Sequence, residues 1–181
     1  MPPDQDDVDQ QLMRRVAQGD RAALGDLVRR HQERVLALAT RFLGDAILAE
    51  DVCQETFLRV MRSAAAYQPT ARFTTWLYRI VANLSWDQRR RARRAPRPAP
   101  TDAMDEPASV GLEGAELRET VRQAVAALPE RQRLALVLHR YHGMSHADIA
   151  AATGWSQSAV ESCLVRAYAT LRGSLTSTER T

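Results

Sequence analysis

FTTWLYRIVANLSWDQRRRARR, residues 73–94, predicts a helix more clearly than any other part of the chain. Its apolar residues fall at i, i+3, i+4, i+7, i+8 and i+11, the stripe of a helix packed on a core: Phe73, Trp76, Leu77, Ile80, Val81 and Leu84. At about 100° per residue, the opposite surface is expected to face solvent, and it carries Thr75, Arg79, Trp86, Arg90 and Arg93.

The outer face of residues 73–94 suits nucleic acid, because it interleaves arginines with an aromatic ring. Guanidinium groups neutralise phosphates, and an indole stacks on an unpaired base for roughly 1–3 kcal/mol. An ordinary amphipathic helix with a solvated basic end would show the same pattern. The segment alone does not decide between the two interpretations.

Composition narrows the class of protein. The chain has 181 residues, enough for one ordinary domain or two small ones, and its 45% hydrophobic content supports real cores. Cys53 and Cys163 lie far apart without CxxC spacing, which indicates neither a disulfide framework nor a zinc site. The N-terminus is acidic, and no run of about eighteen apolar residues occurs. We therefore expect a soluble cytoplasmic protein without direct membrane insertion, metal or cofactor.

Prolines and glycines interrupt an otherwise helical sequence between residues 95 and 113. We therefore predict an all-α fold of two small helical domains, residues 1–94 and 114–181, joined by a flexible linker over 95–113. Six arginines lie between Arg89 and Arg97 and an acidic tract follows, which indicates two surfaces with different partners. The helices are expected at about 8–18, 20–44, 45–62, 73–94, 113–128, 131–141, 146–152 and 157–173.

The last two helices have the strongest local signature. Ser145 to Asp148 is a capping-box pattern, Gly154 makes the turn, and Ser156 caps a second helix. This is a helix-turn-helix, whose second helix reads base edges in the major groove, or else a plain helical hairpin. Its outward positions are Gln157, Ser158, Glu161, Ser162, Val165 and Arg166. Glu161 either accepts a hydrogen bond from cytosine N4 or closes a capping box with Ser158, and both remain open.

The helix expected over 45–62 presents a different surface. Its inner face is apolar, and its outer face groups Asp51, Gln54, Glu55 and Leu58. Acidic residues around an exposed leucine favour a protein partner with a basic helix, although a solvated acidic face is the default for a single helix.

Three segments in this order, EDVCQETFLRV, RFTTWLYRIVANLSWDQRRR and the helix-turn-helix segment from residue 128 to 172, resemble the extracytoplasmic-function sigma factors of bacterial RNA polymerase. The resemblance covers nearly the whole chain. It implies a region 2 domain, a region 4 domain and a linker that replaces region 3. It also implies a promoter-specificity subunit without catalytic residues or a small-molecule substrate, controlled by an anti-sigma factor.

The resemblance also implies site residues. The outer face of 45–62, Asp51, Gln54, Glu55 and Leu58, would dock on the β′ clamp helices of core RNA polymerase. The minus-ten promoter element would be recognised and melted by Tyr67, Arg79, Asn83, Trp86, Arg89 and Arg90. Region 4 would bind the minus-thirty-five duplex and the β flap. Glu161 and Cys163 depart from the commoner family pattern, whereas Ser162 and Arg166 match it.

Two other interpretations compete with this one. His139, His142 and His146 straddle a helix end and a turn, and no acidic residue apart from Asp148 joins them at ligand spacing, which disfavours a metal enzyme. The stronger alternative is a helix-turn-helix transcriptional regulator that binds duplex DNA independently of polymerase. Such a protein would need neither an acidic docking face nor an exposed aromatic on its basic helix.

Overall fold

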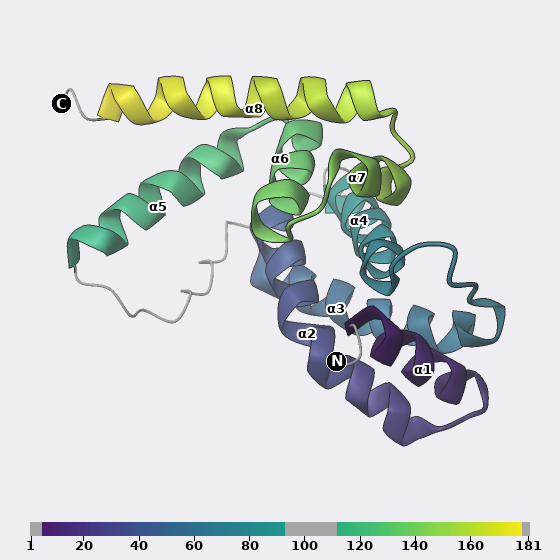
Figure 1. Cartoon of the computed structure of the whole chain (residues 1–181). Coiled ribbons are helices and arrows are strands. Elements are labelled where there is room, and N and C mark those ends of the chain that lie inside the picture. The colour runs from purple at the N-terminus through teal and green to yellow at the C-terminus, as the bar shows by residue number, and fades with distance from the viewer. Residues whose placement is uncertain (1–4, 93–111, 179–181) are drawn as a thin grey trace.

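The computed structural model describes residues 5–92 and 112–178, and every regular element in these ranges is a helix (Figure 1). The N-terminal half contains α1 (Gln5–Ala17), α2 (Arg21–Leu43), α3 (Ala46–Ser63), the 3₁₀ turn η1 (Ala64–Ala66) and α4 (Phe73–Ala92). The C-terminal half contains α5 (Leu112–Ala127), α6 (Glu130–Leu136), the π-helical turn η2 (Val137–Tyr141), α7 (His146–Thr153) and α8 (Gln157–Thr178). The all-α prediction is confirmed. Arg93 lies outside the described residues, and so does the predicted linker except for residues 112 and 113. None of the described helices is long and apolar enough to cross a membrane.

Local capping sets the ends of the first long helices as the sequence predicted. The Asp20 side chain accepts hydrogen bonds from the backbone N–H groups of residues 22 and 23, which starts α2. Gly44 ends the helix at φ 71°, a left-handed conformation that glycine adopts without strain. Asp45 then accepts from the Leu48 N–H at 3.0 Å and starts α3.

Helices α1, α3 and α4 pack around α2, and a buried carboxylate fixes α1. Asp9 is 1% exposed and receives two hydrogen bonds, from Arg30 Nε at 2.8 Å and from His31 Nε2 at 2.9 Å. Both partners lie on α2, so the cost of burying Asp9 is offset only when α1 is docked. From the same helix, Asp6 accepts from the Phe73 N–H at 2.6 Å and satisfies the first turn of α4.

The two halves of the chain pack directly against each other (Figure 1), with α7 lying along α4 and α6 near the end of α2. The buried guanidinium of Arg133 joins the two halves. Arg133 of α6 donates to the Phe42 carbonyl of α2 at 3.1 Å and to the Leu128 carbonyl at 3.1 Å. Burial, together with the charge of Arg89, lowers the pKa of Arg133 to about 10. Helix α8 packs on α6 and α7, and α5 packs against α8 (Figure 1).

Candidate nucleic-acid interface

The outer surface of α4 carries one stripe of four predicted site residues, which we call the α4 stripe: Arg79, Asn83, Trp86 and Arg90. Their spacing of i, i+4, i+7 and i+11 places them on one side of the helix. Arg79, Asn83 and Arg90 are exposed, and Arg90 pairs with Asp87 at 2.9 Å. The stripe therefore carries two arginines and an asparagine around one indole.

Trp86 does not face open solvent, so that part of the prediction is wrong. Its ring is half-buried and stacks on Phe42 of α2, with centroids 5.6 Å apart and planes 20° apart. Trp155, in the turn between α7 and α8, meets it edge-on at 6.2 Å. The helical pattern placed Trp86 on the outer side of α4 correctly. It missed that the end of α2 and the second half of the chain both reach this side.

Thr75 was also predicted to face solvent, and this is wrong for the same reason. The residue is 5% exposed, and its hydroxyl bonds Asp148 Oδ1 of α7 at 3.3 Å. Trp76, expected in the core, is half-buried and packs edge-on against Tyr67 at 4.9 Å. The face of α4 that a single helix would leave open is thus partly covered by α7.

Tyr67 lies far from Trp86. Its ring packs near the first turn of α4, about 20 Å from the Trp86 position at a rise of about 1.5 Å per residue. The hydroxyl is buried without a hydrogen-bond partner among the described residues. Burial first, then the charges of Asp6 and Asp9, raise the pKa of Tyr67 to about 12. Tyr67 is therefore a neutral, half-buried phenol at the opposite end of α4.

Arg89 is bound within the chain rather than presented to solvent. It forms an ion pair with Glu130 of α6 and donates to the carbonyls of Phe42 and Leu43 at 3.3 and 3.2 Å. These carbonyls end α2, where a cation interacts favourably with the helix dipole. Arg89 therefore joins α2, α4 and α6.

The helix-turn-helix has the local chemistry that the sequence predicted. The Ser145 hydroxyl accepts from the Asp148 N–H at 3.1 Å, and Asp148 Oδ2 accepts from the Ser145 N–H at 3.3 Å. The Ser145 hydroxyl also donates to Asp148 Oδ2 at 2.6 Å, and this bond foremost, together with the bond from the Ser145 N–H, lowers the pKa of Asp148. Gly154 ends α7 at φ 74°, and Ser156 Oγ accepts from the Ala159 N–H at 3.2 Å to start α8.

All six predicted outward residues of α8 are exposed: Gln157, Ser158, Glu161, Ser162, Val165 and Arg166. The suggested capping box of Ser158 with Glu161 is wrong. The cap is Ser156, and Ser158 Oγ lies 3.0 Å from Ser156 Oγ. Among the described residues no hydrogen bond joins Ser158 to Glu161, so the Glu161 carboxylate stands on the open face of α8.

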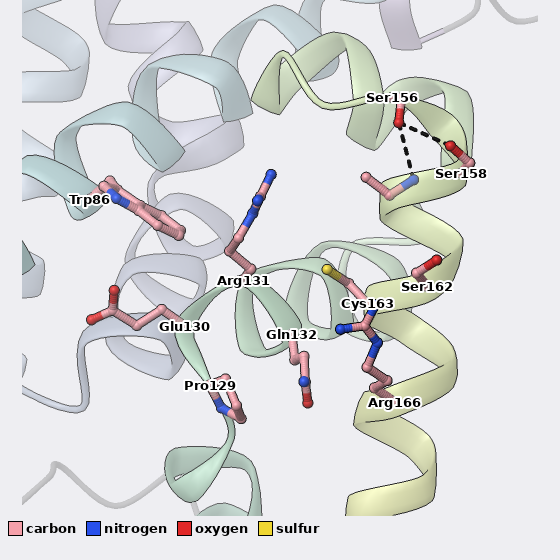
Figure 2. A pocket seen from close by; sticks show the side chains of 11 residues that line it. Trp86, Pro129, Glu130, Arg131, Gln132, Ser156, Ser158, Ser162, Cys163 and Arg166 are labelled. Carbon is pink, nitrogen blue, oxygen red and sulfur yellow. Dashed lines mark hydrogen bonds between the residues drawn. The ribbon is translucent and has the colours of Figure 1, made fainter.

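A cleft of about 650 Å³ separates Trp86 from α8 (Figure 2). Its walls include Ser158, Ser162 and Arg166 from α8 and Arg131 from α6. Arg131 points into the space between Trp86 and the start of α8, with its guanidinium 4.5 Å from the Trp155 ring centroid. Sequence reasoning missed both Arg131 and Trp155. The sequence feature that could have revealed Trp155 is the presence of an aromatic residue in the turn of the helix-turn-helix.

The outer face of α3 matches its prediction. Asp51, Gln54 and Leu58 are exposed, with Leu58 at 42%. Glu55 is half-buried and pairs with Arg59 at 3.1 Å and Arg62 at 3.6 Å. Part of the negative charge of this face is thereby neutralised within α3.

Comparisons with known proteins agree with this arrangement. The family descriptions "Sigma-70 region 2" and "Sigma-70, region 4" match residues 27–95 and 118–171. The chain is 36% identical to the RNA polymerase sigma-H factor of Pseudomonas aeruginosa, over 88% of this chain and 89% of that protein. It is 32% identical to the ECF RNA polymerase sigma-E factor of Escherichia coli, over 88% and 90%.

A solved structure has the same architecture. CnrH, in complex with the cytosolic domain of CnrY, matches with a TM-score of 0.73 and 29% identity, over 94% of this chain and 98% of that chain. The region 2 match runs from within α2 to the end of α4, and the region 4 match runs from within α5 into α8. The chain therefore belongs to the extracytoplasmic-function sigma factors of the sigma-70 family, transcription initiation factors of bacterial RNA polymerase.

Proposed function

We propose that this sigma factor divides promoter recognition between its halves, with region 4 reading the minus-thirty-five duplex and region 2 opening the minus-ten element. The observation that carries the proposal is the α4 stripe, where exposed arginines flank an indole on one side of a helix. Cations hold the backbone of a separated strand, and the indole stacks on a base turned out of the duplex.

The exposed face of α8 would lie in the major groove. Its first three turns carry hydroxyl, amide and guanidinium groups, which are the groups that reach base edges and phosphates there. Arg131, beside the same cleft, is placed to add a phosphate contact. The Glu161 carboxylate would repel phosphates and could accept from a cytosine amino group.

The α3 face would dock on core polymerase. Asp51 and Gln54 surround the exposed Leu58, so a basic partner helix would gain both complementary charge and apolar contact. We assign this partner as the β′ clamp helices, and region 4 as the partner of the β flap. The chain then contributes no catalytic residue, because nucleotide addition belongs to the polymerase.

Regulation by an anti-sigma factor is part of the same proposal. CnrH was solved in complex with the cytosolic domain of CnrY, which supports a protein partner for a chain of this architecture. A partner that covers the α3 face or the α4 stripe would keep the factor from polymerase or from promoter DNA.

The test combines the purified chain with core RNA polymerase and fragments of its own genomic DNA. Transcripts that start at shared upstream sequences only when both proteins are present are the expected result. Sequence-specific binding to duplex DNA by the chain alone at physiological salt, without polymerase-dependent transcripts, would instead identify a conventional helix-turn-helix regulator.

A further inference from the structure

We propose that Glu161 sets the sequence that α8 reads, by requiring a cytosine at one position of the minus-thirty-five element. This assignment rests on the proposed function, in which α8 lies in the major groove, and it adds the identity of a base. The observation behind it is a carboxylate that stands exposed on the outward face of α8.

The six outward residues at the start of α8 form two rows, each with a spacing of four residues that keeps its members on one side of the helix. The cleft row lines the cleft of Figure 2 and consists of Ser158, Ser162 and Arg166. The open row does not line that cleft and consists of Gln157, Glu161 and Val165. Arg131 of α6 lines the same cleft as Arg166, so both arginines lie on one side of α8. Phosphate contacts are therefore expected on the cleft side, which leaves the open row to meet base edges.

The packing of the chain gives Glu161 no structural partner. Among the residues that the structure describes, it forms no hydrogen bond or ion pair. The positions three and four residues away hold no cation, so no helical ion pair is available to it. Glu161 is also the fifth residue of α8, beyond the first turn in which a carboxylate gains from the helix dipole. The carboxylate is thus free for a partner outside the chain.

The chemistry of a carboxylate restricts which base this partner is, because a carboxylate accepts hydrogen bonds and donates none. In the major groove, cytosine presents the N4 amino donor, adenine presents a donor beside the N7 acceptor, and guanine and thymine present acceptor oxygens. An acceptor opposite the carboxylate leaves both groups without a partner once water is excluded, which costs more than a hydrogen bond gains. Glu161 therefore favours cytosine, tolerates adenine less well and excludes guanine and thymine.

This role is one of discrimination more than of affinity. The carboxylate is repelled by the DNA phosphates whatever the sequence, and the bond from cytosine N4 offsets that repulsion at the correct site. At a wrong base the repulsion remains and the carboxylate loses its water, so the wrong site is rejected. Arg131 and Arg166 supply cations on the other side of α8, where they hold the DNA backbone.

Transcription of a promoter library by the full chain and core RNA polymerase tests the assignment. The template is a promoter that the two proteins transcribe together, with the six base pairs of its minus-thirty-five element randomised and a barcode in each transcript. The parent is compared with Glu161→Gln and Glu161→Ala. The matched control is Glu119→Gln, which removes the same charge from an exposed residue of α5.

We expect the parent to prefer cytosine over guanine or thymine at one position by about fivefold to a hundredfold, the range for one good side-chain–base contact. Glu161→Gln should move the preference at that position to adenine, because an amide pairs with adenine N6 and N7. Glu161→Ala should reduce it to within about twofold, whereas Glu119→Gln should keep the cytosine. A parent without a cytosine preference, or a preference that Glu161→Ala retains, would overturn the assignment.

A chemically altered template tests the same contact with the parent chain alone. Uracil in place of the cytosine, paired with adenine, presents the O4 acceptor of thymine without its methyl group. It should be transcribed as poorly as thymine, and transcription equal to that from cytosine would overturn the role of the amino donor. If the parent and core polymerase transcribe no promoter at all, the proposed function fails. If they transcribe promoters without a base that depends on Glu161, this assignment alone fails.

Discussion

Trp86 packs inside the chain and is also the residue to which the proposed function gives a role in recognition. Its ring stacks on Phe42 and also borders the cleft beside α8. Aromatic rings suit such positions because one face can be buried while the other remains available. Any test of its role must therefore separate lost packing from lost stacking on DNA.

We predict that Trp86→Ala slows open-complex formation on closed duplex promoters by about tenfold or more, since base stacking on an aromatic ring is worth about 1–3 kcal/mol. Trp86→Phe keeps a ring against Phe42 and should lose less. Permanganate reactivity of the minus-ten thymines measures the effect, with core binding as the control. Equal reactivity for Trp86→Ala and the parent would contradict the assignment.

Arg166 and Glu161 are exposed within two turns of each other on α8 but carry opposite charges. We predict that Arg166→Ala weakens promoter-specific transcription by about fivefold to a hundredfold, because a good arginine–base pair is worth about 1–3 kcal/mol. Glu161→Ala should have a smaller effect, since a carboxylate also repels phosphates. Run-off transcription ranks the two variants, and the reverse ranking would show that Glu161 is the main contact.

At the scale of elements, backbone conformation fixes how the two helices of the helix-turn-helix meet. Gly154 has φ +74°, whereas Gly173 lies inside α8 with open space around its Cβ position. The same substitution to alanine therefore has opposite physical consequences at the two positions. At Gly154, alanine would have to adopt a left-handed conformation that an L residue disfavours. At Gly173, alanine removes backbone freedom from the unfolded chain.

We predict that Gly154→Ala destabilises the chain by about 1–2 kcal/mol. Gly173→Ala should stabilise it by about 0.5–1 kcal/mol. Midpoints of urea unfolding measure both changes, and each variant serves as the control for the other. Midpoints that move in the same direction would show that α8 does not continue through residue 173, or that the turn has relaxed.

At the scale of the whole molecule, the contact between the halves buries a histidine. His142 packs edge-on against Tyr78 of α4 at 4.9 Å, and both ring nitrogens are buried without hydrogen-bond partners among the described residues. Burial first, then the charges of Arg41 and Arg34, lower its pKa to about 4. A polar pocket of about 210 Å³ adjoins His142. The charged residues that line this pocket are Asp6, Asp9, Arg34, Arg72 and Asp148.

We predict that this histidine makes stability fall with acidification. The folded chain keeps His142 neutral, whereas the unfolded chain protonates it near pH 6.5, so its effect is absent above 6.5 and grows as the pH falls toward 4. The loss is at most about 3 kcal/mol. His142→Phe should flatten the stability curve over this range relative to the parent, whereas His146→Gln, at an exposed histidine, should follow the parent. The prediction is contradicted if the stability of His142→Phe depends on pH as steeply as that of the parent.

Helix existence, caps and the exposed face of α8 were predictable, because each depends on residues close together in the sequence. Ser145 and Asp148 cap α7 from three residues apart, and Gly154 needs only its own backbone freedom. Trp86 and Thr75 were misplaced because their neighbours come from distant segments. Phe42, Asp148 and Trp155 lie 44, 73 and 69 positions away along the chain.

The residues alone specify an all-helical chain, the capped ends of several helices and the faces that carry charge, because periodicity and capping are local properties. They place the end of α8 wrongly, since the helix continues past Gly173 to Thr178. They also carry the motifs that place the chain among sigma factors. The packing of region 4 on α4 follows from the fold as a whole, since periodicity reports which side of a helix is apolar and not what covers its polar side. That contact covers part of the α4 stripe, because Arg79 donates to the Ala151 carbonyl and Trp155 packs edge-on against Trp86.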